Sequence, residues 1–150
     1  MKINNLDNQK LKASSKKISK KYDGLQNLIL ALNKRNLPED IVIQVNEKIK
    51  IINSSIASSS KFLSLLRKTH TNILGLLEKE LKLVPKHFYR DRWMAIGMSV
   101  FGVPIGVAMG SALGNMAFIG VGIPIGMAIG IGLGTAKDKA AEEAGLQLDI

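Results

Sequence analysis

The sequence predicts an all-α protein in which an N-terminal antiparallel helical (coiled-coil) module is followed by a two-helix transmembrane hairpin. Two observations predict this fold class. In the first 85 residues, apolar side chains recur at intervals of three and four, as on one face of an amphipathic helix. Residues 93–136 then form a run of 44 residues without a charged side chain. Because one spanning helix needs about 20 apolar residues, this run is long enough for two.

The N-terminal module, residues 1–85, is expected to contain three helices, at about 1–37, 38–54 and 59–83. Pro38 marks the second start, since proline is favoured at the first helical position and the two acids after it suit the positive end of the helix dipole. The predicted apolar seams are Leu11, Ser15, Ile18, Tyr22, Leu25, Ile29 and Leu32, then Val42, Val45, Ile49, Ile52 and Ile56, then Leu63, Leu66, His70, Ile73, Leu77 and Glu80. The third seam is expected to be widened by Phe62, Leu65, Leu76 and Leu81.

The positive charge of the chain is concentrated before the uncharged run. The formal net charge is +9, and 19 of the 21 Lys and Arg lie in the first 92 residues. Basic helices beside a bilayer favour contact with anionic lipid headgroups, and a solvated coiled-coil face is an equally weighted alternative, with nucleic acid ranked third. The expected partners of the module are therefore anionic lipid headgroups or a cytosolic protein. The chain has no Cys, which fits a protein that faces the cytosol. The first 21 residues carry seven Lys and no apolar run, so no secretory signal is expected.

Residues 86–93 are expected to form a belt at the membrane interface. Aromatic and basic side chains alternate here directly before the apolar run, and such rings lie at headgroup level while the cations reach water. Two further cations follow the run at its other end. The predicted interface residues are Phe88, Tyr89, Arg90, Arg92, Trp93, Lys137 and Lys139.

The uncharged run contains an internal duplication. Phe101–Asn115 and Val121–Thr135 are identical at eight of fifteen positions. Each copy carries glycines four residues apart, so the glycines of a copy share one helix face and let a second backbone approach closely. The predicted helix-packing residues are Gly102, Gly106, Gly110 and Gly114, then Gly122, Gly126, Gly130 and Gly134. The hairpin, residues 94–135, is expected to turn at Gly114-Asn115.

A second face of small residues lies opposite the glycines. In the first copy it consists of Pro104, Ala108 and Ala112, and a helix with two such faces can pack against two neighbours. We therefore expect a homo-oligomer. A β-strand with small and large residues in alternation is the rival interpretation, but Pro104 and Pro124 cannot donate within a central ladder, and lipid does not tolerate open sheet edges.

The cations that flank the hairpin predict its orientation. They lie at both outer ends and not at the turn, so both termini should be cytoplasmic, in a bacterial inner (cytoplasmic) membrane. The tail, residues 136–150, has mixed charges and is expected to extend the second helix to Ala144 as a solvated cytoplasmic segment.

No catalytic, cofactor-binding or metal-binding constellation is predicted. His70 lies on a helical seam and His87 in the interface belt, and two separated histidines without Cys suggest no metal site. The segment Gly130–Lys137 resembles a phosphate-binding loop only superficially, because it lacks the required glycine–lysine spacing. We expect no enzyme.

Part of the chain resembles small bacterial membrane proteins of uncharacterised activity with a glycine-zipper transmembrane hairpin. The matching pieces are Lys79–Trp93 (KELKLVPKHFYRDRW), the two GxPIGxAxG copies and Gly134–Ile150 (GTAKDKAAEEAGLQLDI). The resemblance runs from Leu81 to Leu148, a little under half of the chain. It implies a two-span bacterial membrane protein and implies no activity.

Two functions follow as expectations. The first is a non-enzymatic, oligomeric integral membrane protein that acts as a scaffold or anchor, with the cytosolic helical module binding a partner. The alternative is a pore-forming effector of the holin-like, bacteriocin-like or abortive-infection type. Transport or catalysis is disfavoured because no charge within the predicted spans marks a pathway.

Overall fold

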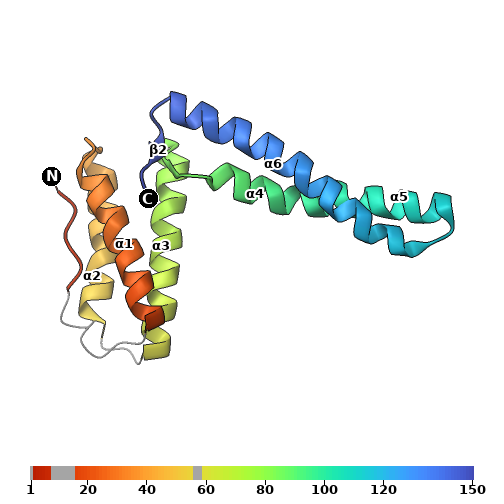
Figure 1. Ribbon diagram of the computed structural model, residues 1–150. Coiled ribbons are helices and arrows are strands. Elements are labelled where there is room, and N and C mark those ends of the chain that lie inside the picture. The colour runs from red at the N-terminus through yellow and green to blue at the C-terminus, as the bar shows by residue number, and fades with distance from the viewer. Residues whose placement is uncertain (1, 8–15, 56–58) are drawn as a thin grey trace. The chain divides into compact units, whose positions relative to one another are not determined.

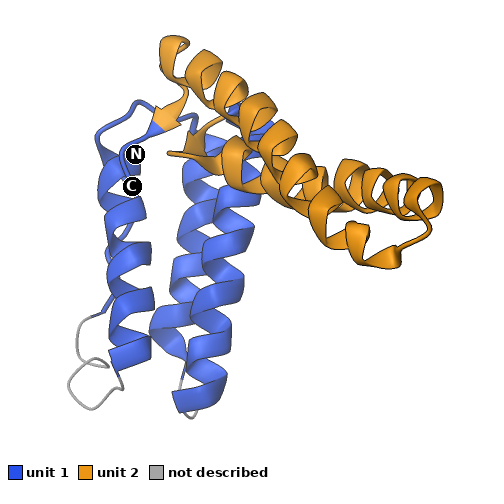
Figure 2. Ribbon diagram, turned by 45° about the vertical axis from the view of Figure 1, so that its right-hand side comes forward, with its two compact units in different colours: residues 1–82, 148–150 blue, residues 83–147 orange. Residues whose placement is uncertain are grey.

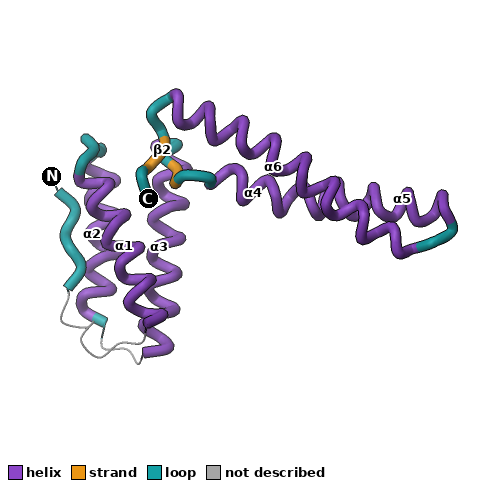
Figure 3. Tube along the Cα trace, in the orientation of Figure 1, coloured by secondary structure: helices purple, strands orange, loops and turns teal. Residues whose placement is uncertain are grey.

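A computed structural model describes residues 2–7, 16–55 and 59–150 of this chain. Its helices confirm the predicted all-α fold class (Figure 1; Figure 3). The chain divides into two compact units, coloured separately in Figure 2: residues 1–82 with 148–150 (unit 1), and residues 83–147 (unit 2).

Unit 1 is built from three amphipathic helices, α1 (Lys16–Asn33), α2 (Glu39–Ser54) and α3 (Ser59–Leu81). Both α1 and α2 pack against α3 (Figure 1). Their apolar stripes form a core in which most side chains are fully removed from solvent, and this burial is the main stabilising contribution to the unit. The core side chains are Ile18, Tyr22, Leu25, Leu28, Ile29, Leu32, Ile41, Val42, Val45, Ile49, Ile52, Phe62, Leu66, Ile73 and Leu77.

The break between α1 and α2 has the predicted cause. Pro38 is the N-cap of α2, with φ −56° and ψ 145°, and the backbone N–H of Val42 donates to the Pro38 carbonyl at 3.2 Å. Glu39 and Asp40 occupy the first turn, where the positive end of the helix dipole stabilises their negative charges.

The seam of α3 differs from the prediction. Leu66, Ile73 and Leu77 are buried as predicted, and so is Phe62, which was expected to widen the seam. Leu63 and His70, which were expected on the seam, are only half-buried, and Glu80 is exposed. Thr69 is buried in place of its neighbour His70, whose ring nitrogens are costly to remove from water.

The N-terminal segment, residues 2–7, also differs from the prediction. It was expected within a first helix over residues 1–37, but it is not helical, and its Ile3 and Leu6 side chains are buried. Its backbone is hydrogen-bonded by amide side chains of α1 and α2 instead of by its own helical turns. The seam positions predicted at Leu11, Ser15 and Ile56 lie outside the described residues.

Unit 2 is a helical hairpin. Its first arm, residues 88–113, comprises α4 (Phe88–Gly97), a π-helical turn (Met98–Gly102) and α5 (Val103–Leu113). A short 3₁₀ turn (Met116–Phe118) leads into the second arm, α6 (Ile119–Glu143). The arms run antiparallel and pack along their length (Figure 1; Figure 3).

A short strand pair accompanies the open end of the hairpin. Strand β1 (Val84–Pro85) pairs with β2 (Gln147–Leu148), and the Val84 N–H donates to the Leu146 carbonyl at 3.0 Å. The sequence pattern did not predict this pairing, because runs of two residues carry no periodicity.

Candidate functional site

The two arms of the hairpin meet through glycine. Gly102, Gly106 and Gly110 on the first arm are buried, and so are Gly122, Gly126, Gly130 and Gly134 on α6. A Cβ atom added at Gly106 would lie 2.6 Å from the Cα of Ile119. A Cβ added at Gly122 would collide with the backbone of Gly102 and Gly106. Only glycine therefore permits this backbone approach.

Gly97 belongs to the same contact, although the four-residue spacing did not predict it. It is buried, and a Cβ there would collide with the Gly126 carbonyl oxygen. It precedes Gly102 by five residues, and the π-helical turn between them has the matching wider period, with the Val103 N–H bonded to the Met98 carbonyl.

Pro104 lies two residues after the π-helical turn, but proline does not by itself account for such a turn. Proline donates no backbone bond and its ring crowds the carbonyl four residues earlier. Pro124 occupies the matching position of the second copy, yet α6 is α-helical throughout. The sequence signal that could have placed Gly97 on the contact face is therefore its five-residue interval from Gly102.

Gly114 serves the turn rather than the contact between the arms. It caps α5 in the left-handed region, with φ 65°, and a Cβ there would meet nothing within 4 Å. Asn115 was expected to share the left-handed turn, but its backbone is extended, with φ −140°. Its side chain accepts the Ala117 N–H at 2.9 Å and its own N–H donates to the Gly110 carbonyl at 2.9 Å, so it caps the next turn.

Asp138 closes the open end of the hairpin. It follows Gly134 by four residues on the same face of α6, and only 5% of it is exposed. Its carboxylate accepts the backbone N–H groups of Tyr89 at 3.0 Å and Arg90 at 2.9 Å. These are two of the N–H groups that the first turn of a helix leaves without a partner. The N-cap residue of α4, His87, makes no side-chain cap, so Asp138 caps α4 from the opposite arm.

This role of Asp138 was not predicted from the sequence. The mixed charges of residues 136–150 predicted a solvated tail that includes Asp138. The available signal was the four-residue spacing, which continues the glycine row of α6 through Asp138. Other charged groups of that segment are exposed as expected, including Lys139 and Glu143, whose charged atoms lie 3.9 Å apart.

The predicted interface residues gather at the open end of the hairpin, in the first turns of α4 and the last turns of α6. The rings of Phe88 and Tyr89 meet edge to face, with centroids 5.3 Å apart. Arg92 lies 5.9 Å from the Phe88 ring centroid, and the Lys137 ammonium lies 5.7 Å from that of Trp93. These are cation–π distances. The Lys137 contact joins the two arms.

The outer surface of the hairpin is strongly apolar. Large aliphatic side chains point away from the contact between the arms, while the small glycines are buried in it. In unit 1 the arrangement is the opposite, because its core consists of large apolar side chains. Exposed large residues on this surface are Val100, Phe101, Val103, Val107, Leu113, Met116, Val121, Ile125, Ile129 and Leu133.

A second row of small residues is also exposed on the hairpin. Cβ atoms added at Gly120 and Gly132 would meet nothing within 4 Å, so these glycines leave open surface. The exposed small residues are Pro104, Ala108 and Ala112 on α5, and Gly120, Pro124, Ala128 and Gly132 on α6.

Neither histidine takes part in a metal-binding cluster within the described ranges, where no group of three His, Asp or Glu side chains could hold an ion. His70 lies half-buried on α3, and burial, followed by the charge of Lys21, lowers its pKa. His87 adopts a left-handed backbone with φ 61° where α4 begins.

The fold and this surface define an all-α chain with two helices, residues 88–113 and 116–143, that are long and apolar enough to cross a membrane. Comparison with protein-family models, curated proteins and solved structures finds no match to the chain.

Proposed function

We propose that the chain is a non-enzymatic integral membrane protein whose hairpins assemble into a homo-oligomeric scaffold or anchor. Its place is the bacterial inner (cytoplasmic) membrane, with both termini cytoplasmic. The lipid bilayer surrounds the hairpin, and the helical module of unit 1 binds a cytosolic partner or anionic headgroups.

The observation that carries this proposal is the inverted packing of the hairpin. Glycine forms its interior, and the side chains with the most apolar surface, such as Ile125, Ile129 and Leu133, face outward. Exposure of a row of such side chains to water is costly, whereas lipid solvates them without cost. Arms of 26 and 28 residues also exceed the ~20 residues that the hydrocarbon core requires.

Assembly is supported by the second row of small residues. Close approach of backbones drives helix association in lipid, where the hydrophobic effect between helices is lost. The glycine contact already serves the hairpin itself, so the exposed row that includes Ala128 and Gly132 remains for a second copy.

Two isoleucine substitutions separate hairpin closure from assembly. Gly126→Ile introduces a side chain against the backbone of Gly102 and should open the hairpin and abolish oligomers. Gly106→Ile should do the same. A Cβ at position 132 would meet nothing within 4 Å, so Gly132→Ile should leave the hairpin closed and still abolish oligomers. Assembly is measured by the yield of crosslinked oligomers in membranes. Closure of the hairpin is measured by the fluorescence of Trp93, the single tryptophan.

Ile129→Leu, a change on the exposed aliphatic row, is the matched control and should leave both readouts unchanged. Oligomers that persist in Gly132→Ile would contradict assembly through the second row. Leakage of dye from liposomes by purified oligomer, with loss of membrane potential on expression, would favour the pore-forming alternative over the scaffold.

A further inference from the structure

The N-terminal segment, residues 2–7, lies in a cradle of amide side chains on unit 1. Four residues, which we call the amide cradle, hold its backbone: Gln26 and Asn33 on α1, and Asn46 and Asn53 on α2. The segment contributes no regular helix or strand of its own. Its backbone groups are therefore satisfied by side chains from two helices, as a bound peptide would be.

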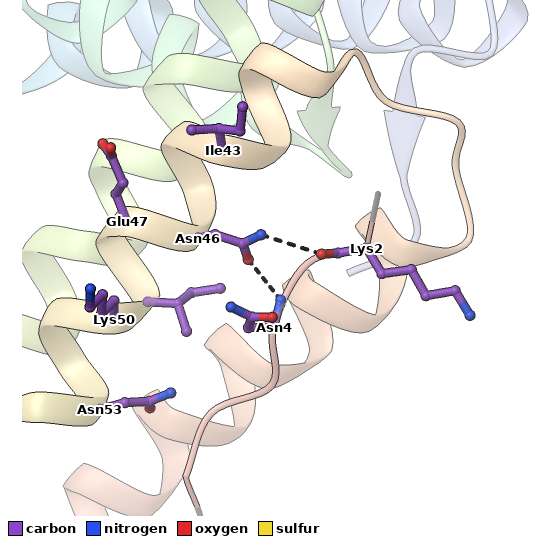
Figure 4. Close-up of a pocket in the computed structure, with 8 residues that line it drawn as sticks. Lys2, Asn4, Ile43, Asn46, Glu47, Lys50 and Asn53 are labelled. Carbon is purple, nitrogen blue, oxygen red and sulfur yellow. Dashed lines mark hydrogen bonds between the residues drawn. The ribbon is translucent and has the colours of Figure 1, made fainter.

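Three asparagines of the cradle each form two hydrogen bonds with the backbone of the segment. Asn33 accepts the Ile3 N–H at 2.8 Å and donates to the Ile3 carbonyl at 3.1 Å. Asn46 accepts the Asn4 N–H at 2.7 Å and donates to the Lys2 carbonyl at 3.3 Å, as the dashed lines of Figure 4 show.

Similar hydrogen bonds hold the later residues of the segment. Asn53 accepts the Asp7 N–H at 3.1 Å and donates to the Asn5 carbonyl at 3.2 Å. Gln26 accepts the Leu6 N–H at 3.4 Å. Every one of these hydrogen bonds reaches the backbone of the segment, so the amide side chains themselves recognise the course of the chain. Selection for particular side chains comes from the two buried ones, Ile3 and Leu6.

The spacing of the cradle matches an extended chain. Asn46 and Asn53 are seven residues apart on α2, as are Gln26 and Asn33 on α1, and seven helical residues rise by about 10.5 Å. The contacts on each helix advance by three residues of the segment, and three extended residues span about 10 Å. The same step of three separates the two buried anchors, Ile3 and Leu6.

The cradle opens to solvent on the side of α2. The bonds made by Asn46 and Asn53 are exposed, whereas those made by Asn33 and Gln26 are partly buried. A surface hollow of about 370 Å³ lies beside Asn46 and the segment, with the exposed side chain of Ile43 on its wall (Figure 4). A competing chain therefore has access to the α2 side of the cradle.

We propose that the amide cradle is a binding site for extended peptides, and that residues 2–7 are its resident ligand, which a partner polypeptide displaces. The partner is a protein with an accessible extended segment that carries two aliphatic residues three positions apart. The inference rests on the partner-binding role proposed for unit 1 and not on assembly of the hairpin.

The test uses the full chain in detergent micelles with residues 2–7 deleted, and a synthetic peptide of residues 1–7 that carries a fluorophore at its carboxyl end. Fluorescence anisotropy should show saturable binding to the deleted chain and much weaker binding to the intact chain, whose cradle is occupied. Asn46→Ala and Asn53→Ala should each weaken binding about tenfold or more, since each removes two hydrogen bonds.

Matched controls distinguish binding of the peptide at the amide cradle from non-specific binding. Asn72→Ala, on the exposed surface of α3, should leave the affinity unchanged. In the peptide, N-methylation at Asn4 removes the N–H that Asn46 accepts and should weaken binding several-fold. N-methylation at Asn5, whose carbonyl rather than N–H is held, should be tolerated. A peptide with Ile3→Asp and Leu6→Asp should not bind, because both anchors are buried.

If the deletion unfolds unit 1, the peptide added in trans should restore its helical circular dichroism with a saturable dose dependence. The absence of both binding and restoration at millimolar peptide would overturn the inference. Binding that survives Asn46→Ala and Asn53→Ala together would also overturn it. Because assembly is read separately by crosslinking, loss of peptide binding with intact oligomers would refute the cradle alone.

Discussion

At the scale of single residues, the position of Asp138 determines how the hairpin closes. A buried carboxylate is costly unless hydrogen bonds satisfy it, and here the first-turn N–H groups of α4 do so. The carboxylate and helix α4 stabilise each other, because those N–H groups lie at the positive end of the dipole of α4. The cap therefore ties the end of α6 to the start of α4 without a covalent bond.

Removal of this cap should destabilise the hairpin. Asp138→Ala leaves the Tyr89 and Arg90 N–H groups without their acceptor, which should cost about 1–3 kcal/mol. The measurement is denaturation in micelles followed by Trp93 fluorescence, with amide hydrogen exchange at Tyr89 and Arg90. Glu142→Gln, on the exposed side of α6, is the control. Unchanged exchange at both amides would contradict the capping role.

His70 should make the stability of unit 1 depend on pH. Burial, and then the charge of Lys21, lowers its pKa from the ordinary value of 6.5. Below that value the unfolded chain binds a proton that the folded chain resists, so the free energy of unfolding falls as pH drops and levels off below the folded pKa. Thermal unfolding read by circular dichroism should therefore shift to lower temperature from about pH 8 to about pH 5.

Two variants test the origin of this pH dependence. His70→Gln should flatten it, and Lys21→Gln should reduce it only in part, because the Lys21 charge is the smaller cause of the lowered pKa. A pH dependence that is equally steep in His70→Gln would rule out this histidine as its source.

At the scale of elements, the same amino acid has opposite roles in the two units. Gly24 in α1 and Gly75 in α3 lie within helices, and a Cβ at either would meet nothing within 4 Å. Gly97 in α4 lies against the backbone of α6. The first two glycines therefore weaken their helices, whereas the third allows its helix to pack.

Alanine substitutions should reveal this difference. Gly24→Ala and Gly75→Ala should each raise the free energy of unfolding of unit 1 by about 0.5–1 kcal/mol, since alanine loses less conformational entropy in a helix. Gly97→Ala should destabilise the hairpin, because the added Cβ collides with the Gly126 carbonyl. The change in the free energy of unfolding is measured by urea denaturation, followed by circular dichroism for unit 1 and by Trp93 fluorescence for the hairpin. Destabilisation by Gly24→Ala would contradict the open surroundings of that position.

At the scale of the whole molecule, the two units expose opposite surfaces. Unit 1 buries most of its large aliphatic side chains in a core, whereas the hairpin buries glycine and exposes many such side chains. Among the described residues, only the two helices of the hairpin are long and apolar enough to cross a membrane. The proposed topology places unit 1 and the end of α6 on the cytoplasmic side and the turn on the other.

Cysteine labelling tests this topology directly, because the chain has no cysteine of its own. Met116→Cys, in the exposed turn, should react with a membrane-impermeant maleimide added to intact spheroplasts. Ala140→Cys, exposed near the end of α6, should react only after the membrane is permeabilised. Equal labelling of both sites in intact spheroplasts would contradict the hairpin topology.

Local pattern predicted much of the fold and part of the site. The break at Pro38, the turn at Gly114 and the two apolar arms follow from backbone chemistry and hydropathy, which act over a few residues. The roles of Gly97 and Asp138 did not follow, because each depends on a partner in the other arm. The amide cradle was missed for the same reason, since its asparagines have no apolar period of their own.

The sequence by itself determined that the chain is helical, where the glycines share a face, and that two of its helices are long and apolar enough to cross a membrane. These properties depend on periodicity and composition, which are local. Only the tertiary structure decided which residue caps α4, that amide side chains hold residues 2–7, and that Gly97 joins the contact. Each of these depends on a contact with the backbone of a distant segment, and the hydrogen-bonded partners lie between 20 and 49 residues apart along the chain.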